Sequence, residues 1–66
     1  MSNLESLIRL NDLERQLNEL QELVDALRAA NPANGELQYR LDIQQQLMDI
    51  ERERIMNAKS LFISPN

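Results

Sequence analysis

Hydrophobic residues in the first half of the chain recur with the spacing of a coiled-coil helix. From residue 10 to residue 27 they are separated by alternating steps of three and four: Leu10, Leu13, Leu17, Leu20, Val24 and Leu27. On a helix this spacing gives one narrow stripe, which is typical of a coiled-coil or hairpin seam. We predict that these residues form the seam of a helical hairpin. The acidic residues beside them are interpreted as solvated: Glu14, Glu19, Glu22 and Asp25.

The first two turns do not continue this seam. Leu4 and Ile8 point roughly 150° away from it if the helix is regular. One interpretation is a helix break near residues 9–11, where Asn11 offers a second cap. The other is a continuous helix whose first turns face a different surface or fold over the end of the hairpin.

One interruption divides the chain into two helical segments. Asn31-Pro32 and Asn34-Gly35 are turn dipeptides, and a residue before proline is disfavoured in a helix. Either Asn31 caps the second helix, with Pro32 as its first residue, or Asn34 does.

The pattern predicts an all-α protein, a two-helix antiparallel hairpin that forms a single module over residues 1–66. Ser2 and Glu5 match a capping box, so the first helix is expected over about 2–30. The turn is expected at 31–35 and the second helix over about 36–61.

The second helix carries two apolar stripes, roughly 120° apart. The first contains Leu37, Leu41, Met48, Ile55 and Phe62, and the second contains Tyr39, Ile43, Leu47, Ile50 and Leu61. The sequence does not decide which stripe packs on the first helix. The other stripe needs a further surface, because large exposed apolar patches are uncommon on monomers. We predict partner binding through Tyr39, Ile43, Leu47 and Ile50, with Leu4 and Ile8 as second candidates.

Tyr39, the only tyrosine, has two interpretations. Tyrosine is enriched at binding surfaces, which favours an interface anchor. It could equally close the hairpin by packing over Leu27 and Ala30.

Composition excludes most catalytic and metal chemistry. The 66 residues include no Cys and no His, so no disulfide, zinc site or histidine base is available. The single glycine rules out a phosphate-binding loop. A net charge of −4 argues against nucleic-acid binding. The carboxylates have no expected pocket, and Arg52, Arg54 and Lys59 are interpreted as complementing the helix dipole. We predict no enzyme activity, no cofactor and no metal.

Location and size point to an intracellular binding module. No secretory signal and no membrane-spanning run is visible, so a soluble cytoplasmic protein is expected. Chains of this size rarely gain more than about 3–5 kcal/mol from one core. We therefore expect association into a larger helical assembly, with itself or with a protein partner.

Several short motifs resemble the small E-type co-chaperones of type III secretion needle subunits. The chain opens Met-Ser-Asn-Leu-Glu at residues 1–5, carries Gly35 in the turn and has Gln-Tyr at 38–39. Glu51 lines up with a glutamate in the middle of the family's second helix. The resemblance implies a hairpin that binds a tetratricopeptide-type chaperone. Together they would hold the needle subunit unpolymerised in the cytoplasm.

Three other functions remain open. Two hairpins could self-associate as a four-helix-bundle structural or adaptor module. The hairpin layout is also similar to small phosphatases that act on the aspartyl phosphate of response regulators. Leu41-Asp42 would then belong to their motif, although that motif expects Ser where this chain has Gln38. Asn31-Pro32 is similar to needle or rod subunits themselves.

Overall fold

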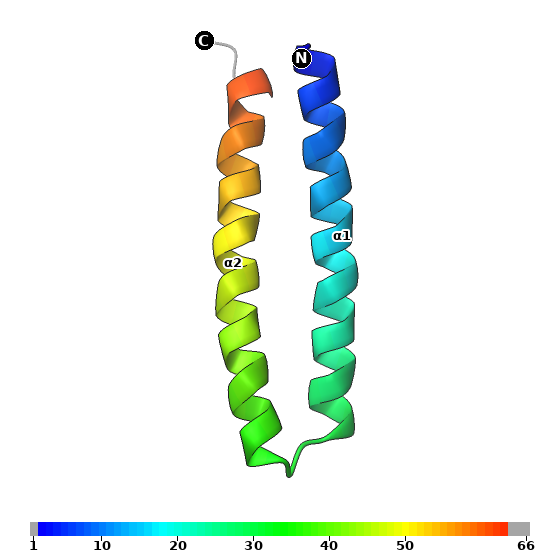
Figure 1. The fold of residues 1–66 in the computed structure, drawn as a ribbon, viewed down its shortest axis with the longest axis vertical. Coiled ribbons are helices and arrows are strands. Elements are labelled where there is room, and N and C mark those ends of the chain that lie inside the picture. The colour runs from blue at the N-terminus through cyan, green and yellow to red at the C-terminus, as the bar shows by residue number, and fades with distance from the viewer. Residues whose placement is uncertain (1, 64–66) are drawn as a thin grey trace.

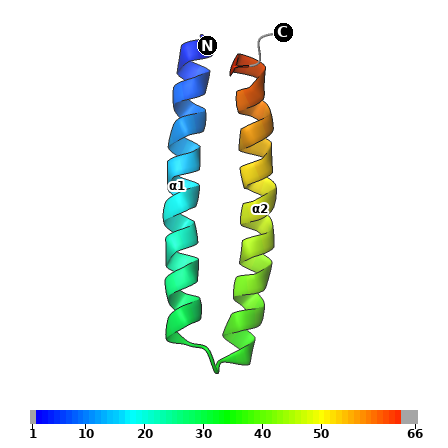
Figure 2. The ribbon, with the colours of Figure 1, turned by 180° about the vertical axis from the view of Figure 1, so that it is seen from behind.

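The computed structural model describes residues 2–63, without the side chain of Ile63. It contains two α-helices, α1 (Asn3–Ala30) and α2 (Gly35–Ile63), and no strand in that range. The helices lie side by side and antiparallel, with the start of α1 beside the end of α2 and the turn at the opposite end (Figures 1 and 2). The hairpin measures 48 × 17 × 17 Å between Cα atoms. The predicted all-α hairpin is confirmed.

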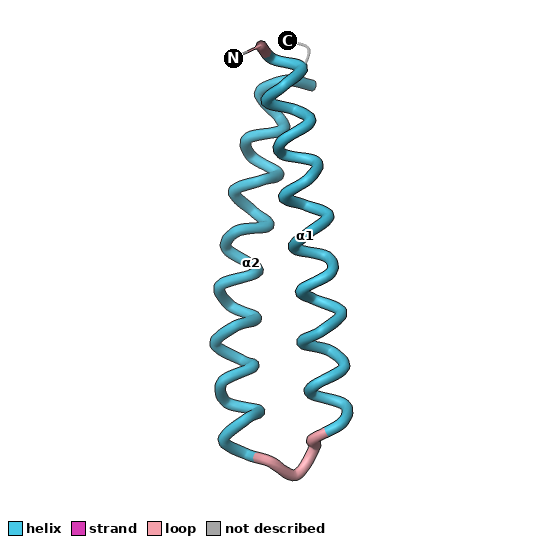
Figure 3. The backbone as a smooth tube through the Cα atoms, turned by 45° about the vertical axis from the view of Figure 1, so that its right-hand side comes forward, coloured by secondary structure: helices cyan, strands magenta, loops and turns pink. Residues whose placement is uncertain are grey.

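The start of α1 follows the predicted capping box. The Ser2 hydroxyl accepts a hydrogen bond from the Glu5 backbone N–H at 3.1 Å, and the Glu5 carboxylate accepts one from the Ser2 N–H at 3.2 Å. From there α1 continues without interruption to Ala30 (Figure 3). The break considered near residues 9–11 is therefore absent. Asn11 and Asp12 are weak helix formers, but the residues that flank them, such as Leu10 and Leu13, are strong ones and carry the helix past the potential internal cap.

The turn is shorter than the predicted range 31–35, because Gly35 is already the first residue of α2. Asn34 rather than Asn31 caps α2, and its side-chain oxygen accepts a bond from the Leu37 N–H at 3.0 Å. Gln38 secures the turn from the other side. Its amide donates to the carbonyl oxygens of Asn31 at 2.7 Å and of Arg28 at 3.2 Å.

Replacing Asn34 with alanine is expected to lower the free energy of unfolding by about 1 kcal/mol, because the first turn of α2 loses its capping acceptor. Asn34→Asp keeps an acceptor at the same place and adds a favourable charge at the helix start. Its stability should therefore stay at or above that of the natural chain. Thermal melts followed by circular dichroism compare the three proteins. Equal melting of the alanine and aspartate variants would contradict the assigned cap.

The core is one thin row of side chains between the helices. The buried hydrophobic residues are Val24, Leu41, Met48 and Ile55, and Met48 is only 1% exposed. Leu17, Leu20 and Leu37 pack against this row and remain partly exposed. The inward stripe of α2 is thus the one that contains Leu41, Met48 and Ile55, which answers the question that the sequence left open.

Candidate protein-binding surfaces

The second stripe of α2 faces away from the core. Tyr39, Ile43, Leu47 and Ile50 are between 42% and 65% exposed, and Leu61 is more exposed still. We call Tyr39, Ile43, Leu47 and Ile50 the docking stripe. Tyr39 is the most exposed of the four, which does not fit a side chain packed over Leu27 and Ala30. The interpretation of Tyr39 as a cap of the hairpin is therefore disfavoured.

Leu4 and Ile8 are exposed as well, but they lie apart from the docking stripe. They are in the first turns of α1, at the open end of the hairpin, whereas Tyr39 is close to the turn (Figure 1). Helical spacing also directs them away from the side of α1 that carries Leu20 and Leu27. One compact partner surface would not contact both groups.

The predicted seam of α1 is buried unevenly. Val24 is buried, and Leu17 and Leu20 pack on the core. Leu10 is partly exposed, while Leu13 and Leu27 count among the exposed large hydrophobic residues. Two helices alone cannot enclose a whole heptad seam, because each seam side chain is covered from one direction only. The seam is therefore both a hairpin contact and part of an open surface.

Polar side chains join the helices along one flank of the seam. Gln21 and Gln45 exchange two amide hydrogen bonds, at 2.6 and 2.8 Å. Other links join Arg52 to Asn18 at 2.7 Å, Lys59 to Glu14 at 2.7 Å, and Arg28 to Asp42 at 2.9 Å and to Gln38 at 3.2 Å. We call this row of paired side chains the polar flank. Since its donors and acceptors satisfy one another, it offers little to a partner.

The polar flank corrects two sequence interpretations. Glu14 was expected to be solvated, but its carboxylate is partly buried and accepts a hydrogen bond from Lys59. Arg52 and Lys59 were expected to complement the dipole of α2, but they lie before its last turn and bond to α1 instead. Most of the side chains that bond across the seam recur at spacings of seven residues within each helix, and this spacing is visible in the sequence. The pairing itself needs the register between the helices, which one sequence does not show.

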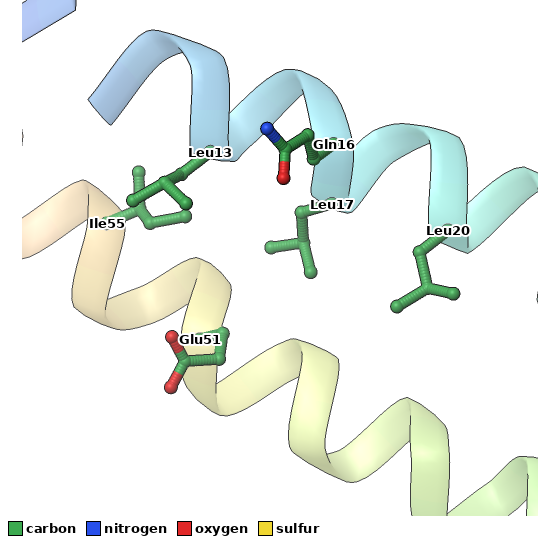
Figure 4. Close-up of a pocket in the computed structure, with 6 residues that line it drawn as sticks. All are labelled: Leu13, Gln16, Leu17, Leu20, Glu51 and Ile55. Carbon is green, nitrogen blue, oxygen red and sulfur yellow. The ribbon is translucent and has the colours of Figure 1, made fainter. Parts of the chain in front are cut away.

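The opposite flank is an apolar groove. It is lined by Leu13, Gln16, Leu17 and Leu20 of α1 and by Glu51 and Ile55 of α2 (Figure 4). The described residues form no hydrogen bond between the helices on this side. Gln16 and Glu51 are the polar groups of the groove, one on each wall. The Glu51 carboxylate accepts a bond from Arg54 at 2.9 Å within its own helix.

Exposed leucines extend the groove toward the turn. Leu23 and Leu27 follow Gln16 and Leu20 by seven residues, and Leu47 precedes Glu51 by four, so all three continue the same flank. Leu23 is 55% exposed, and Leu27 and Leu47 are also exposed. We call the groove together with Leu23, Leu27 and Leu47 the groove face. Sequence reasoning had assigned Leu47 to the docking stripe, so it lies where the two surfaces meet.

No group of three or more acidic side chains within residues 2–63 lies close enough together to hold a metal ion. Asp42, considered for the phosphatase motif, accepts a hydrogen bond from Arg28, and Gln38 secures the turn. Neither described helix is long and apolar enough to cross a bilayer.

The chain matches none of the protein-family models, characterised proteins or solved structures compared with it.

Proposed function

We propose that this chain is a protein-binding hairpin that acts as a co-chaperone, in the manner of the E-type partners of type III secretion needle chaperones. The observation that carries the proposal is the docking stripe. Tyr39, Ile43, Leu47 and Ile50 form a continuous exposed apolar row on one side of α2. The class of partner is proposed from the resemblance to the E-type co-chaperones, which rests on the layout of the hairpin and on the Gln-Tyr pair at the start of α2.

The binding mode follows from the shape of the stripe. Residues at spacings of three and four on a straight helix fit into a concave apolar groove, as in helix-in-groove recognition. The superhelical surface of a tetratricopeptide-type chaperone presents a groove of this kind. The opposite side of α2 packs on α1, so α2 is already helical before it binds a partner. Preformed structure reduces the entropy lost on binding.

Ile43 and Ile50 are the residues to test, because they lie in the docking stripe and outside the groove face. Replacing both with alanine preserves helix propensity and removes the central apolar contacts. We expect the affinity for the chaperone to fall by about 2 kcal/mol or more, which is roughly 30-fold or more in Kd. Isothermal titration calorimetry with the chaperone encoded beside the needle subunit in the source genome measures this change.

The matched control is Met56→Ala, which truncates an exposed apolar residue of α2 near the polar flank. Its affinity should equal that of the natural chain. A second readout is co-expression with chaperone and needle subunit, in which the needle subunit should remain unpolymerised only when all three chains are present. Unchanged affinity of the Ile43→Ala/Ile50→Ala variant, or no complex with the natural chain, would refute the proposal.

A further inference from the structure

The groove face is a continuous surface of apolar side chains, several of which are exposed. It runs from Leu13 to Leu27 on α1 and from Leu47 to Ile55 on α2, and much of its hydrophobic area is open. The polar flank on the other side differs, because its own side chains cover the seam. There, each long polar side chain bonds across the seam. The groove face has no such cover among the described residues.

The exposed area of the whole chain is larger than that of a compact protein of the same mass. The hairpin exposes 5084 Å². A compact monomer of 7.7 kDa exposes about 4,300 Å². The excess, on the order of 750 Å², is close to the roughly 800 Å² that each partner buries in a stable interface of standard size. A surface 48 Å long and 17 Å wide is large enough to supply that area.

We propose that the groove face is covered by a second copy of this chain, and that the two hairpins form an antiparallel four-helix bundle with both turns at the same end. A second hairpin has the same length and width as the face that it would cover. It would also supply leucines at the same heptad spacing, so that each seam is enclosed from both sides. This inference does not depend on the proposed co-chaperone function.

The polar residues of the groove select the orientation of the two copies. Two hairpins packed face to face by a two-fold axis have two arrangements. With the axis along the helices, the turns meet and α1 lies over α2 of the second copy. With the axis across the helices, the turns are at opposite ends and each helix lies over its own equivalent.

Gln16 and Glu51 lie near the middle of their helices and on opposite walls of the groove. When the turns meet, Gln16 of each copy lies over Glu51 of the other, and an amide donor faces a carboxylate acceptor twice. When the turns are opposed, each helix lies over its own equivalent, so Gln16 of one copy does not face Glu51 of the other. A hydrogen bond from an amide to a carboxylate is favourable in a groove that excludes water, and only the arrangement with the turns together forms it. The arrangement with the turns together follows.

Two measurements on the full chain test the proposal. Light scattering after chromatography should give the mass of a dimer. The chain has no cysteine, so a nitroxide label on Ala33→Cys in the exposed turn is unique. Helices in a bundle are about 8–10 Å apart, so pulsed electron resonance should give a label separation below about 25 Å. Turns at opposite ends would place the labels about one hairpin length apart, which is 48 Å.

A matched pair of variants locates the interface. Leu23→Glu places a charge on the groove face, and Met56→Glu places the same charge at a residue of nearly equal exposure, 56%, beside the polar flank. The first should raise the dimer dissociation constant by about tenfold or more, and the second should leave it unchanged. A monomer at every concentration, a separation above about 25 Å, or equal effects of the two variants would overturn the proposal.

Discussion

Replacing Met48 with alanine is expected to lower the free energy of unfolding by about 2–5 kcal/mol. Met48 is the most deeply buried side chain, 1% exposed, and it contacts the cluster of Val24 and Leu41. Truncation removes three heavy atoms from a core that is one side chain thick. The neighbouring residues belong to two long rigid helices, which limits how far they can collapse into the space.

This loss is comparable with the entire stability of such a hairpin. A single core in a chain below about 70–80 residues rarely supplies more than roughly 3–5 kcal/mol. The Met48→Ala protein should therefore be largely unfolded at low concentration and show a weak helical signal in circular dichroism. Ligand or partner binding would restore helicity by mass action, since only the folded hairpin binds.

Met56→Ala is the control for this prediction. The two residues are of the same type and lie eight positions apart in α2, but Met56 is 56% exposed. Its replacement removes little buried area and slightly raises helix propensity, so the melting temperature should change little. Urea melts of both variants at one protein concentration make the comparison. If both variants melted alike, Met48 would not be the centre of the core.

Replacing Asp12 with proline is expected to cost about 3 kcal/mol of helix stability. Asp12 lies inside α1, so proline at that position removes the backbone N–H that bonds to the carbonyl of Ile8, and its ring collides with that carbonyl. Segment 3–11 would then detach from the helix or the whole hairpin would melt at a lower temperature. Backbone chemical shifts and thermal melts distinguish these two outcomes.

Asp12 also distinguishes the continuous helix from the broken one considered in the sequence. In a helix that restarted with Asn11 as its cap, residue 12 would be the first helical residue, where proline is favourable. Asp12→Ala is the control, because it removes the exposed ion pair with Arg15 at 3.1 Å and leaves the backbone intact. Such a pair contributes at most about 1 kcal/mol. If the backbone chemical shifts of the Asp12→Pro variant stayed helical on both sides of residue 12, proline would be tolerated there. That result would show that α1 is interrupted at Asn11.

The sequence also predicted part of the candidate binding surface. The two apolar stripes on one helix predicted that one of them would stay exposed, because a hairpin can bury only one, but the sequence did not decide which one. The groove was not expected. It results from the way the helices pair, since Gln16 and Glu51 are 35 positions apart in the chain and become opposite walls only when α1 and α2 align.

Local physics in the sequence was sufficient to determine the two helices of this protein and the turn between them. The capping box at Ser2, the turn at Asn31–Asn34 and the leucine heptad each act within a few residues, so their effects can be read along the chain. Helix propensity and hydrophobic spacing need no knowledge of distant neighbours.

Only the tertiary structure decided how the helices are rotated and aligned. Both stripes of α2 are apolar enough to pack on α1, and the choice of the row with Met48 depends on shape and on the polar side chains that reach across. The bonds between Gln21 and Gln45 and between Glu14 and Lys59 form at one register only. Register is a property of two segments together, because each bond joins residues that are at least 24 positions apart.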